Sequence, residues 1–113
     1  MNLTTDRTHA VPIVRVREAR LIYPLLSEFS SAVVALIEAG ETRLVIDLST
    51  VGYVDSATIG CLMDLYRQAS AAGGALKLAG VQKRVETMLT MTGAQNFIEV
   101  HPDEPSAVKS FGA

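Results

Sequence analysis

A segment at the predicted start of a helix, Val54 to Gly60, holds the residues of this sequence that are best placed to do chemistry. It reads Val-Asp-Ser-Ala-Thr-Ile-Gly and follows a short apolar run. Ser56 fits the position that caps a helix, where a side-chain oxygen accepts a backbone N–H. A phosphate on Ser56 would also meet free backbone N–H groups and the positive end of the helix dipole. The motif therefore has two interpretations, a structural cap or a site that carries a phosphate.

Other catalytic or metal-binding chemistry is sparse in this sequence. His9, His101 and Cys61 are too widely separated to predict a zinc site. Both histidines are interpreted as exposed loop residues, and Cys61 as a packed residue, because no histidine near it in the sequence would activate its thiol. Paired carboxylates, a catalytic triad and a phosphate-binding glycine loop are also missing. We therefore expect no enzymatic activity, no metal and no cofactor.

The spacing of apolar residues predicts alternating strands and helices. The predicted strands cover residues 11–16, 44–48, 75–79 and 97–100, and the predicted helices cover 24–39, 56–73, 81–93 and 102–111. This order indicates an α/β domain with a largely parallel sheet. Residues 1–10 are polar and are expected to form a flexible N-terminal segment. Asp47 interrupts an apolar strand, and the pattern leaves open whether it is buried with a hydrogen-bond partner or exposed at the strand end.

Composition limits the possible partners and location of the chain. Its 113 residues are 49% hydrophobic and 19% charged, which is typical of one folded domain. Ten basic residues face twelve acidic ones, and no basic block indicates nucleic acid or an anionic membrane. The longest apolar run, 32–37, is too short to insert into a membrane, and the polar N-terminus does not resemble a signal peptide. With its single Cys61, the chain is expected to be cytoplasmic.

The stretch Leu44 to Leu62 resembles the signature of STAS domains, the family of sulfate transporter and anti-sigma factor antagonist domains. It has an apolar strand that ends in Asp47-Leu48, a short loop, and then Asp55-Ser56 followed by small residues. The resemblance continues through a Gly-Gly turn, the strand 75–79 and the helix that follows it, and it covers about residues 11–111. It implies one STAS domain, with a largely parallel mixed β-sheet flanked by about four helices.

The resemblance also implies a role as an anti-sigma factor antagonist. Such a protein binds a partner that is both a serine kinase and an anti-sigma factor. Phosphorylation of the serine after the aspartate, here Ser56, ends the binding, and a phosphatase restores it. The implied partner-binding residues are Asp55, Ser56, Ala57 and Thr58, and we expect the Thr58 side chain to face outward.

Three positions differ from the usual family pattern. Ala57 stands where Ser or Thr is frequent, and Thr58 stands where Gly is common. A turn that resembles Gly-x-Leu-Asp in other members is replaced by Glu18 to Leu21, without the acid. The alternative hypothesis is a STAS scaffold subunit of a signalling assembly or of a membrane transporter, without a phosphorylation switch.

Overall fold

A five-stranded mixed sheet forms the centre of the computed structural model, which describes residues 1–112. The strand order is β1-β2-β4-β6-β7, with β1 antiparallel to β2 and every other neighbouring pair parallel. The strands are β1 (Leu3–Asp6), β2 (Ile13–Val16), β4 (Arg43–Asp47), β6 (Ala75–Ala79) and β7 (Val100–His101). The prediction of an α/β fold with a largely parallel, mixed sheet is confirmed.

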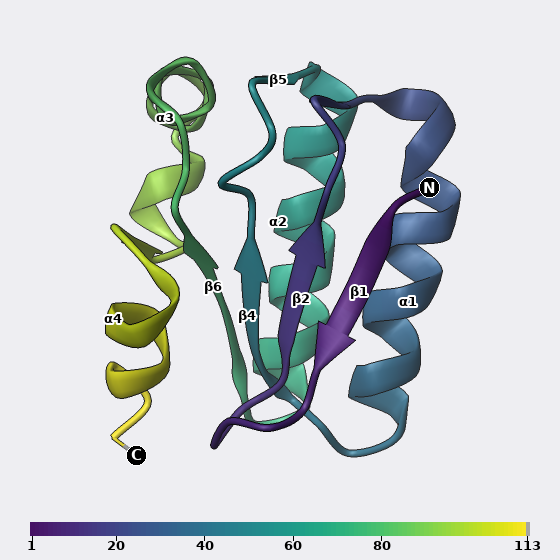
Figure 1. Ribbon diagram of the computed structural model, residues 1–113, viewed down its shortest axis with the longest axis vertical. Coiled ribbons are helices and arrows are strands. Elements are labelled where there is room, and N and C mark those ends of the chain that lie inside the picture. Colours follow the sequence, from purple (N-terminus) through teal and green to yellow (C-terminus); the bar gives the residue numbers. More distant parts are fainter. Residues whose placement is uncertain (113) are drawn as a thin grey trace.

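Four α-helices flank this sheet (Figure 1), as the sequence predicts. They are α1 (Leu26–Glu38), α2 (Ser56–Ala71), α3 (Lys83–Thr92) and the short α4 (Glu104–Lys109). Helices α1, α2 and α3 contribute to the main hydrophobic core, whereas α4 packs on the other face of the sheet against β4, β6 and β7. Within residues 1–112, no helix is long and apolar enough to cross a membrane.

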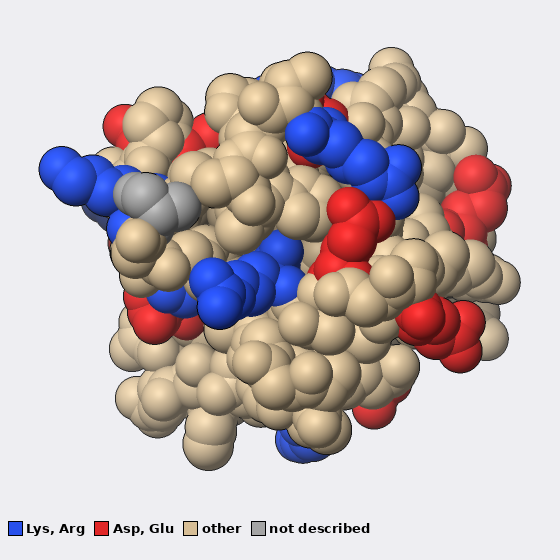
Figure 2. All heavy atoms as spheres, turned by 90° about the horizontal axis from the view of Figure 1, so that it is seen from below, with Lys and Arg blue, Asp and Glu red and all other residues tan. Residues whose placement is uncertain are grey.

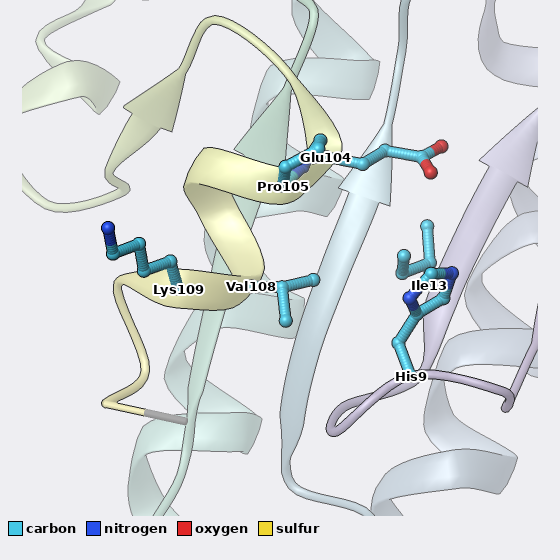
Figure 3. Close-up of a pocket in the computed structure, with 6 residues that line it drawn as sticks. All are labelled: His9, Ile13, Glu104, Pro105, Val108 and Lys109. Atoms are coloured by element: carbon cyan, nitrogen blue, oxygen red, sulfur yellow. The ribbon is translucent and has the colours of Figure 1, made fainter.

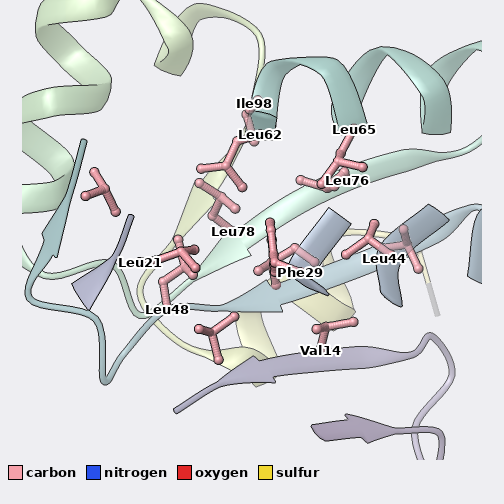
Figure 4. Packing of buried hydrophobic residues seen from close by; sticks show 14 of the residues in the cluster. Val14, Leu21, Phe29, Leu44, Leu48, Leu62, Leu65, Leu76, Leu78 and Ile98 are labelled. Atoms are coloured by element: carbon pink, nitrogen blue, oxygen red, sulfur yellow. The ribbon is translucent and has the colours of Figure 1, made fainter. Parts of the chain in front are cut away.

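Successive residues of the central strands point to opposite faces, and both faces are buried. Toward α1, α2 and α3 the strands present Val14, Val16, Leu44, Ile46, Leu76 and Leu78. Figure 4 shows several of these side chains packed with Phe29 of α1 and Leu62 and Leu65 of α2. Toward α4 the strands present Ile13, Val45 and Ala79, which pack with Ala107. Burial on both faces explains why these strands read as nearly continuous apolar runs.

The predicted helix over 24–39 is correct in type but begins later. Residues Tyr23–Leu25 form a 3-10 turn that contains Pro24, and α1 starts at Leu26. At the end of α3, Gly93 has φ 76°, a conformation that glycine adopts without the steric cost that a side chain brings. Pro24 therefore lies in the turn that leads into α1, and Gly93 ends α3.

A second, two-stranded parallel sheet was not expected from the sequence. It pairs β3 (Arg20–Leu21) with β5 (Tyr53–Val54). Both strands are only two residues long, which is too short for apolar periodicity to reveal them. Their pairing joins the segment after β2 to the segment that leads into α2.

The ends of the chain required two corrections. The flexible segment expected over 1–10 contains β1, whose residues pair with Ile13 to Val16 of β2. An edge strand needs only one neighbour and can stay exposed and polar, so composition does not separate it from a loop. The strand expected over 97–100 is also wrong for residues 97–99. Strand β7 starts at Val100, and Phe97 follows a 3-10 turn over Ala94–Asn96.

Candidate functional site at the start of helix α2

The residue that caps helix α2 is Asp55, and the prediction of Ser56 as the cap is wrong. Asp55 has extended backbone angles, and its Oδ1 accepts the backbone N–H of Thr58 at 2.9 Å. Both residue types cap helices well. Asp55 is favoured because its second oxygen, Oδ2, also accepts the backbone N–H of Tyr23 at 2.9 Å. One carboxylate therefore holds the helix start and a neighbouring turn together.

Ser56 is the first residue of α2, and its side chain is exposed. Among residues 1–112, no side-chain hydrogen bond engages its hydroxyl. The hydroxyl lies at the positive end of a 16-residue helix. Ala57, the next residue, is also exposed. The geometry thus leaves Ser56 accessible to a second protein without making it part of the helix cap.

Thr58 is fully buried, so the prediction that its side chain faces outward is wrong. Its Oγ1 lies 2.7 Å from the carbonyl oxygen of Leu21 and 2.7 Å from Asp55 Oδ1. The hydroxyl therefore bridges the β3 segment and the helix cap from the inside. Because a kinase needs an accessible hydroxyl, the buried Thr58 is not a position where a phosphate could be added.

Further contacts hold the turn after β2 against the start of α2. The backbone N–H of Gly52 donates to the carbonyl of Ala19 at 2.8 Å. The guanidinium of Arg20 lies 5.2 Å from the centre of the Tyr53 ring. Tyr23 and Tyr53, which sequence reasoning did not select, are 73% and 36% exposed. The β3–β5 pairing places Tyr53, and the bond to Asp55 places the backbone of Tyr23. The one signal in the sequence was the unusual turn at 18–21.

The electrostatics of the site depend on Asp55. Partial burial raises the pKa of this carboxyl group, but hydrogen bonds from Thr58 and from the amide of Tyr23 outweigh that effect and leave the pKa below its ordinary value. Asp55 is therefore ionised at neutral pH. It remains an acceptor for the helix start, and it places one negative charge beside Ser56.

The other chemically interesting residues lie elsewhere and do not form a catalytic group. Burial, followed by the nearby charge of Asp64, raises the pKa of the Cys61 thiol, which makes it a poor nucleophile. His101 is half-buried in β7 rather than in an exposed loop, and its Nε2 lies 3.0 Å from Glu99 Oε1. Within residues 1–112, no three histidine, cysteine or acidic side chains are grouped to hold a metal ion.

A cleft of about 300 Å³ lies on the opposite face of the sheet, beside α4. Figure 3 shows its lining by His9, Ile13, Glu104, Pro105, Val108 and Lys109. The Glu104 carboxylate points out of the cleft toward β2, where Arg15 binds it at 2.7 and 2.8 Å. The Lys109 ammonium group points away from it. The cleft is thus separate from Ser56, and the two charged side chains Glu104 and Lys109 do not converge in it.

Charged side chains are mixed on the end of the molecule seen from below Figure 1. Figure 2 shows Lys and Arg in separate small groups on this face, several of them beside Asp or Glu, with uncharged surface between them. Arg7 and Glu41 form an ion pair, at 2.7 Å. The visible face therefore has no continuous basic surface of the kind that binds nucleic acid.

Comparison with known proteins supports the resemblance seen in the sequence. The sequence model of the STAS domain matches residues 2–107. An anti-sigma factor antagonist from Mycobacterium paratuberculosis has a similar structure, with a TM-score of 0.88 and 18% identity over 99% of this chain and 94% of that chain. The Bacillus cell fate determinant SpoIIAA in its phosphorylated form has a TM-score of 0.74 and 14% identity, covering 97% and 99% of the two chains.

A transporter also contains this fold. The murine Solute Carrier 26 family member A9 anion transporter matches with a TM-score of 0.74 and 20% identity. The match covers 91% of this chain but 18% of the transporter. At these identities the likeness establishes the fold alone.

Proposed function

The chain belongs to the STAS domain family, and from that membership we propose that it is an anti-sigma factor antagonist. In this proposal it binds, in the cytoplasm, a protein that is both a serine kinase and an anti-sigma factor. Phosphorylation of Ser56 by that partner ends the binding, and a phosphatase restores it. The antagonist itself is not an enzyme, and its function is to bind and release.

The observation that carries the proposal is the exposed hydroxyl of Ser56 at the first position of α2. Asp55, not Ser56, makes the cap, so modification of Ser56 leaves the capping bonds to Thr58 in place. The helix dipole favours a phosphate at this end. Ser56 is therefore a position where the surface can change charge while the fold persists.

A phosphate would change binding through charge. It adds about −1.5 to −2 charges at pH 7 to a surface where Asp55 already contributes one. A partner that desolvates this surface would have to bury an unpaired anion, which is costly. Asp55 and Ala57 border Ser56 in the proposed contact surface, whereas the buried Thr58 supports it from beneath.

The test is phosphate transfer to the purified protein from ATP by the kinase isolated with it. We expect mass spectrometry to place the phosphate on Ser56, and we expect the Ser56→Ala variant to bind the kinase but accept no phosphate. Ser70→Ala is a matched control, because Ser70 is exposed on the same helix four turns away. Phosphate on Ser70, or unchanged labelling of Ser56→Ala, would contradict the proposal.

The likeness to part of an anion transporter favours a second candidate, a scaffold subunit without a switch. In that case the chain would bind a permease or a signalling assembly through surfaces that do not depend on Ser56. Affinity for the co-purified partner separates the two functions. Equal affinity of Ser56→Ala and Ser56→Asp supports the scaffold, whereas loss of binding in Ser56→Asp alone supports the antagonist.

A further inference from the structure

Exposed cations from two separate segments lie at the same end of the sheet as Ser56, where helix α2 begins. Arg17 and Arg20 come from the turn after β2, and Lys83 and Arg84 begin α3. All four side chains are exposed. We call these four residues the basic edge.

Hydrogen bonds through the loop between β4 and β5 fix the two segments relative to each other. The N–H of Gly52 donates to the carbonyl of Ala19, and the Gln82 side chain donates to the carbonyl of Ser49, both at 2.8 Å. Helix α3 also packs against β5, which leads directly into Asp55 and Ser56. The basic edge and the start of α2 therefore form one continuous, internally braced surface.

The cations of the basic edge form no ion pair within residues 1–112, which is also true of Arg43, Arg67 and Lys109. Within residues 1–112, none of the four lies within 4 Å of a carboxylate oxygen, whereas ion pairs hold Arg7, Arg15 and Lys77 elsewhere.

Carboxylates at this edge offset part of the charge of the cations. Asp55 accepts its capping bonds and Glu18 accepts the N–H of Asn2 at 2.6 Å, but these neutral donors leave one formal negative charge on each. Glu86, on the first turn of α3, supplies a third. Four cations against these three carboxylates leave a formal local charge of +1, on a chain whose net charge is −2.

Two exposed tyrosines lie on the same surface. Tyr23 is held by its backbone bond to Asp55, and Tyr53 lies under the guanidinium of Arg20. Their side chains are 73% and 36% exposed although their backbones are fixed. Tyrosine and arginine are enriched among the residues that dominate binding energy at protein interfaces, and a fixed backbone lowers the entropy lost on binding.

We propose that the partner of the Ser56 face presents an acidic surface around an apolar pocket, with the basic edge and the tyrosines Tyr23 and Tyr53 as its contacts. This inference rests on the proposed function and specifies the chemistry of its partner. It also gives a reason for release, because a phosphate on Ser56 offsets the charge of the basic edge and repels an acidic partner. The turn at Glu18 to Leu21 has Leu21 at the position where the family resemblance predicts an acid, and Arg20 stands directly before it.

A first experiment needs no knowledge of the partner. A peptide of about ten glutamates is titrated into the 113-residue chain while backbone amide shifts are followed by NMR. We expect the shifts to concentrate at residues 17–23, 53–57 and 83–84, and we expect prior phosphorylation of Ser56 to suppress them. Shifts centred on Arg43 or Arg67, which are exposed cations elsewhere, would overturn the proposal, as would no shifts at all.

Two triple variants with equal charge changes sharpen the test. One carries Arg20→Gln, Lys83→Gln and Arg84→Gln. Its control carries Arg43→Gln, Arg67→Gln and Lys109→Gln, three exposed cations that lie outside the basic edge. With each exposed contact contributing about twofold to fivefold, we expect the first variant to lose about tenfold or more in affinity for the kinase partner and the control to change about twofold at most. Equal losses would overturn the proposal.

A tyrosine variant tests the apolar part of the contact. Tyr23→Ala should fold normally because the ring is mostly exposed, and it should weaken partner binding about tenfold while the glutamate peptide still binds. Unchanged partner affinity would show that the apolar contact is absent.

Failure of this inference and failure of the proposed function give different results. If the kinase phosphorylates Ser56 but both triple variants bind it equally, the function stands and the acidic partner surface is wrong. If Ser56 is never phosphorylated but the peptide maps to the basic edge, the switch is wrong and the acidic contact stands. Binding to phosphatidylglycerol vesicles that the first triple variant abolishes, without peptide shifts, would identify a lipid surface instead and overturn the proposal.

Discussion

Two carboxylates hold distant parts of this chain together, and they do so with different partners. Asp55, at the start of α2, accepts from the N–H of Tyr23, the N–H of Thr58 and the nearby Thr58 hydroxyl. Glu104, at the start of α4, binds the guanidinium of Arg15, which also contacts Asp6 at 2.9 Å. The first cluster braces the Ser56 surface, and the second attaches the C-terminal helix to the sheet.

The difference between these clusters explains why one of them suits a charge switch. Neutral donors satisfy Asp55 and leave its charge in place, so a further negative charge nearby changes the surface strongly. In the second cluster Arg15 compensates Asp6 and Glu104, and Asp47 is buried beside them, where burial and the Glu104 carboxylate raise its pKa. The charges of that cluster are paired within the protein, whereas the Ser56 surface is held in place but stays exposed to a partner.

The largest expected effect comes from the buried hydroxyl of Thr58. Thr58→Arg would force a charge into a fully buried position, and we expect it to remove about 3 kcal/mol or more of unfolding free energy. Thr58→Ser keeps the hydroxyl and should retain most of the stability. Urea unfolding of the two variants measures this. Near-native stability of Thr58→Arg would mean that Thr58 is not buried between Leu21 and Asp55.

The cap itself should have the next largest effect. Asp55→Ala removes the helix cap and the bond to Tyr23, with an expected loss of about 1–3 kcal/mol. Asp55→Asn retains an acceptor oxygen and serves as the control, with a smaller expected loss. The same urea titration compares them. If Ser56→Ala cost more than Asp55→Ala, the assignment of the cap to Asp55 would be wrong.

The ion pair of Glu104 and Arg15 should make the free energy of unfolding depend on pH. Hydrogen bonds from Arg15 lower the pKa of Glu104 to about 2 from its ordinary 4.5. The stabilisation that the ionised Glu104 contributes is therefore full above about pH 4.5 and is lost as the pH falls toward about 2. The pKa of Asp47 is raised, so protonation of Asp47 stabilises the folded protein and opposes that loss. We expect wild type to lose about 1 kcal/mol more than Glu104→Gln over this range. Parallel pH profiles would contradict the assignment of the acid loss to this pair.

The smallest effect on stability should come from Ser56. A cap serine replaced by Ala would cost about 0.5–2 kcal/mol, but Ser56 is not the cap, so we expect Ser56→Ala to stay within about 0.5 kcal/mol of wild type. Thermal unfolding measures this directly. A clear loss of stability in Ser56→Ala would show that the Ser56 hydroxyl helps to hold the fold together.

The sequence determined the fold class and most of its elements. The apolar run 44–48 predicts a strand buried on both faces, the alternation over 75–79 predicts another strand, and the helical stripe after Ser56 matches α2. The motif at 54–60 also placed the helix start within one residue of the observed cap, Asp55. These features follow from local periodicity, which needs no knowledge of distant contacts.

Only the tertiary structure decided how the site is built. Asp55 and Ser56 are equally good caps by type, and the choice between them depends on Tyr23, 32 residues away in the chain. Thr58 lies buried because Leu21 offers it a carbonyl, and β3 and β5 are too short to exist without each other. Local sequence specifies which groups can form bonds, but these bonds join segments that only the complete fold brings together.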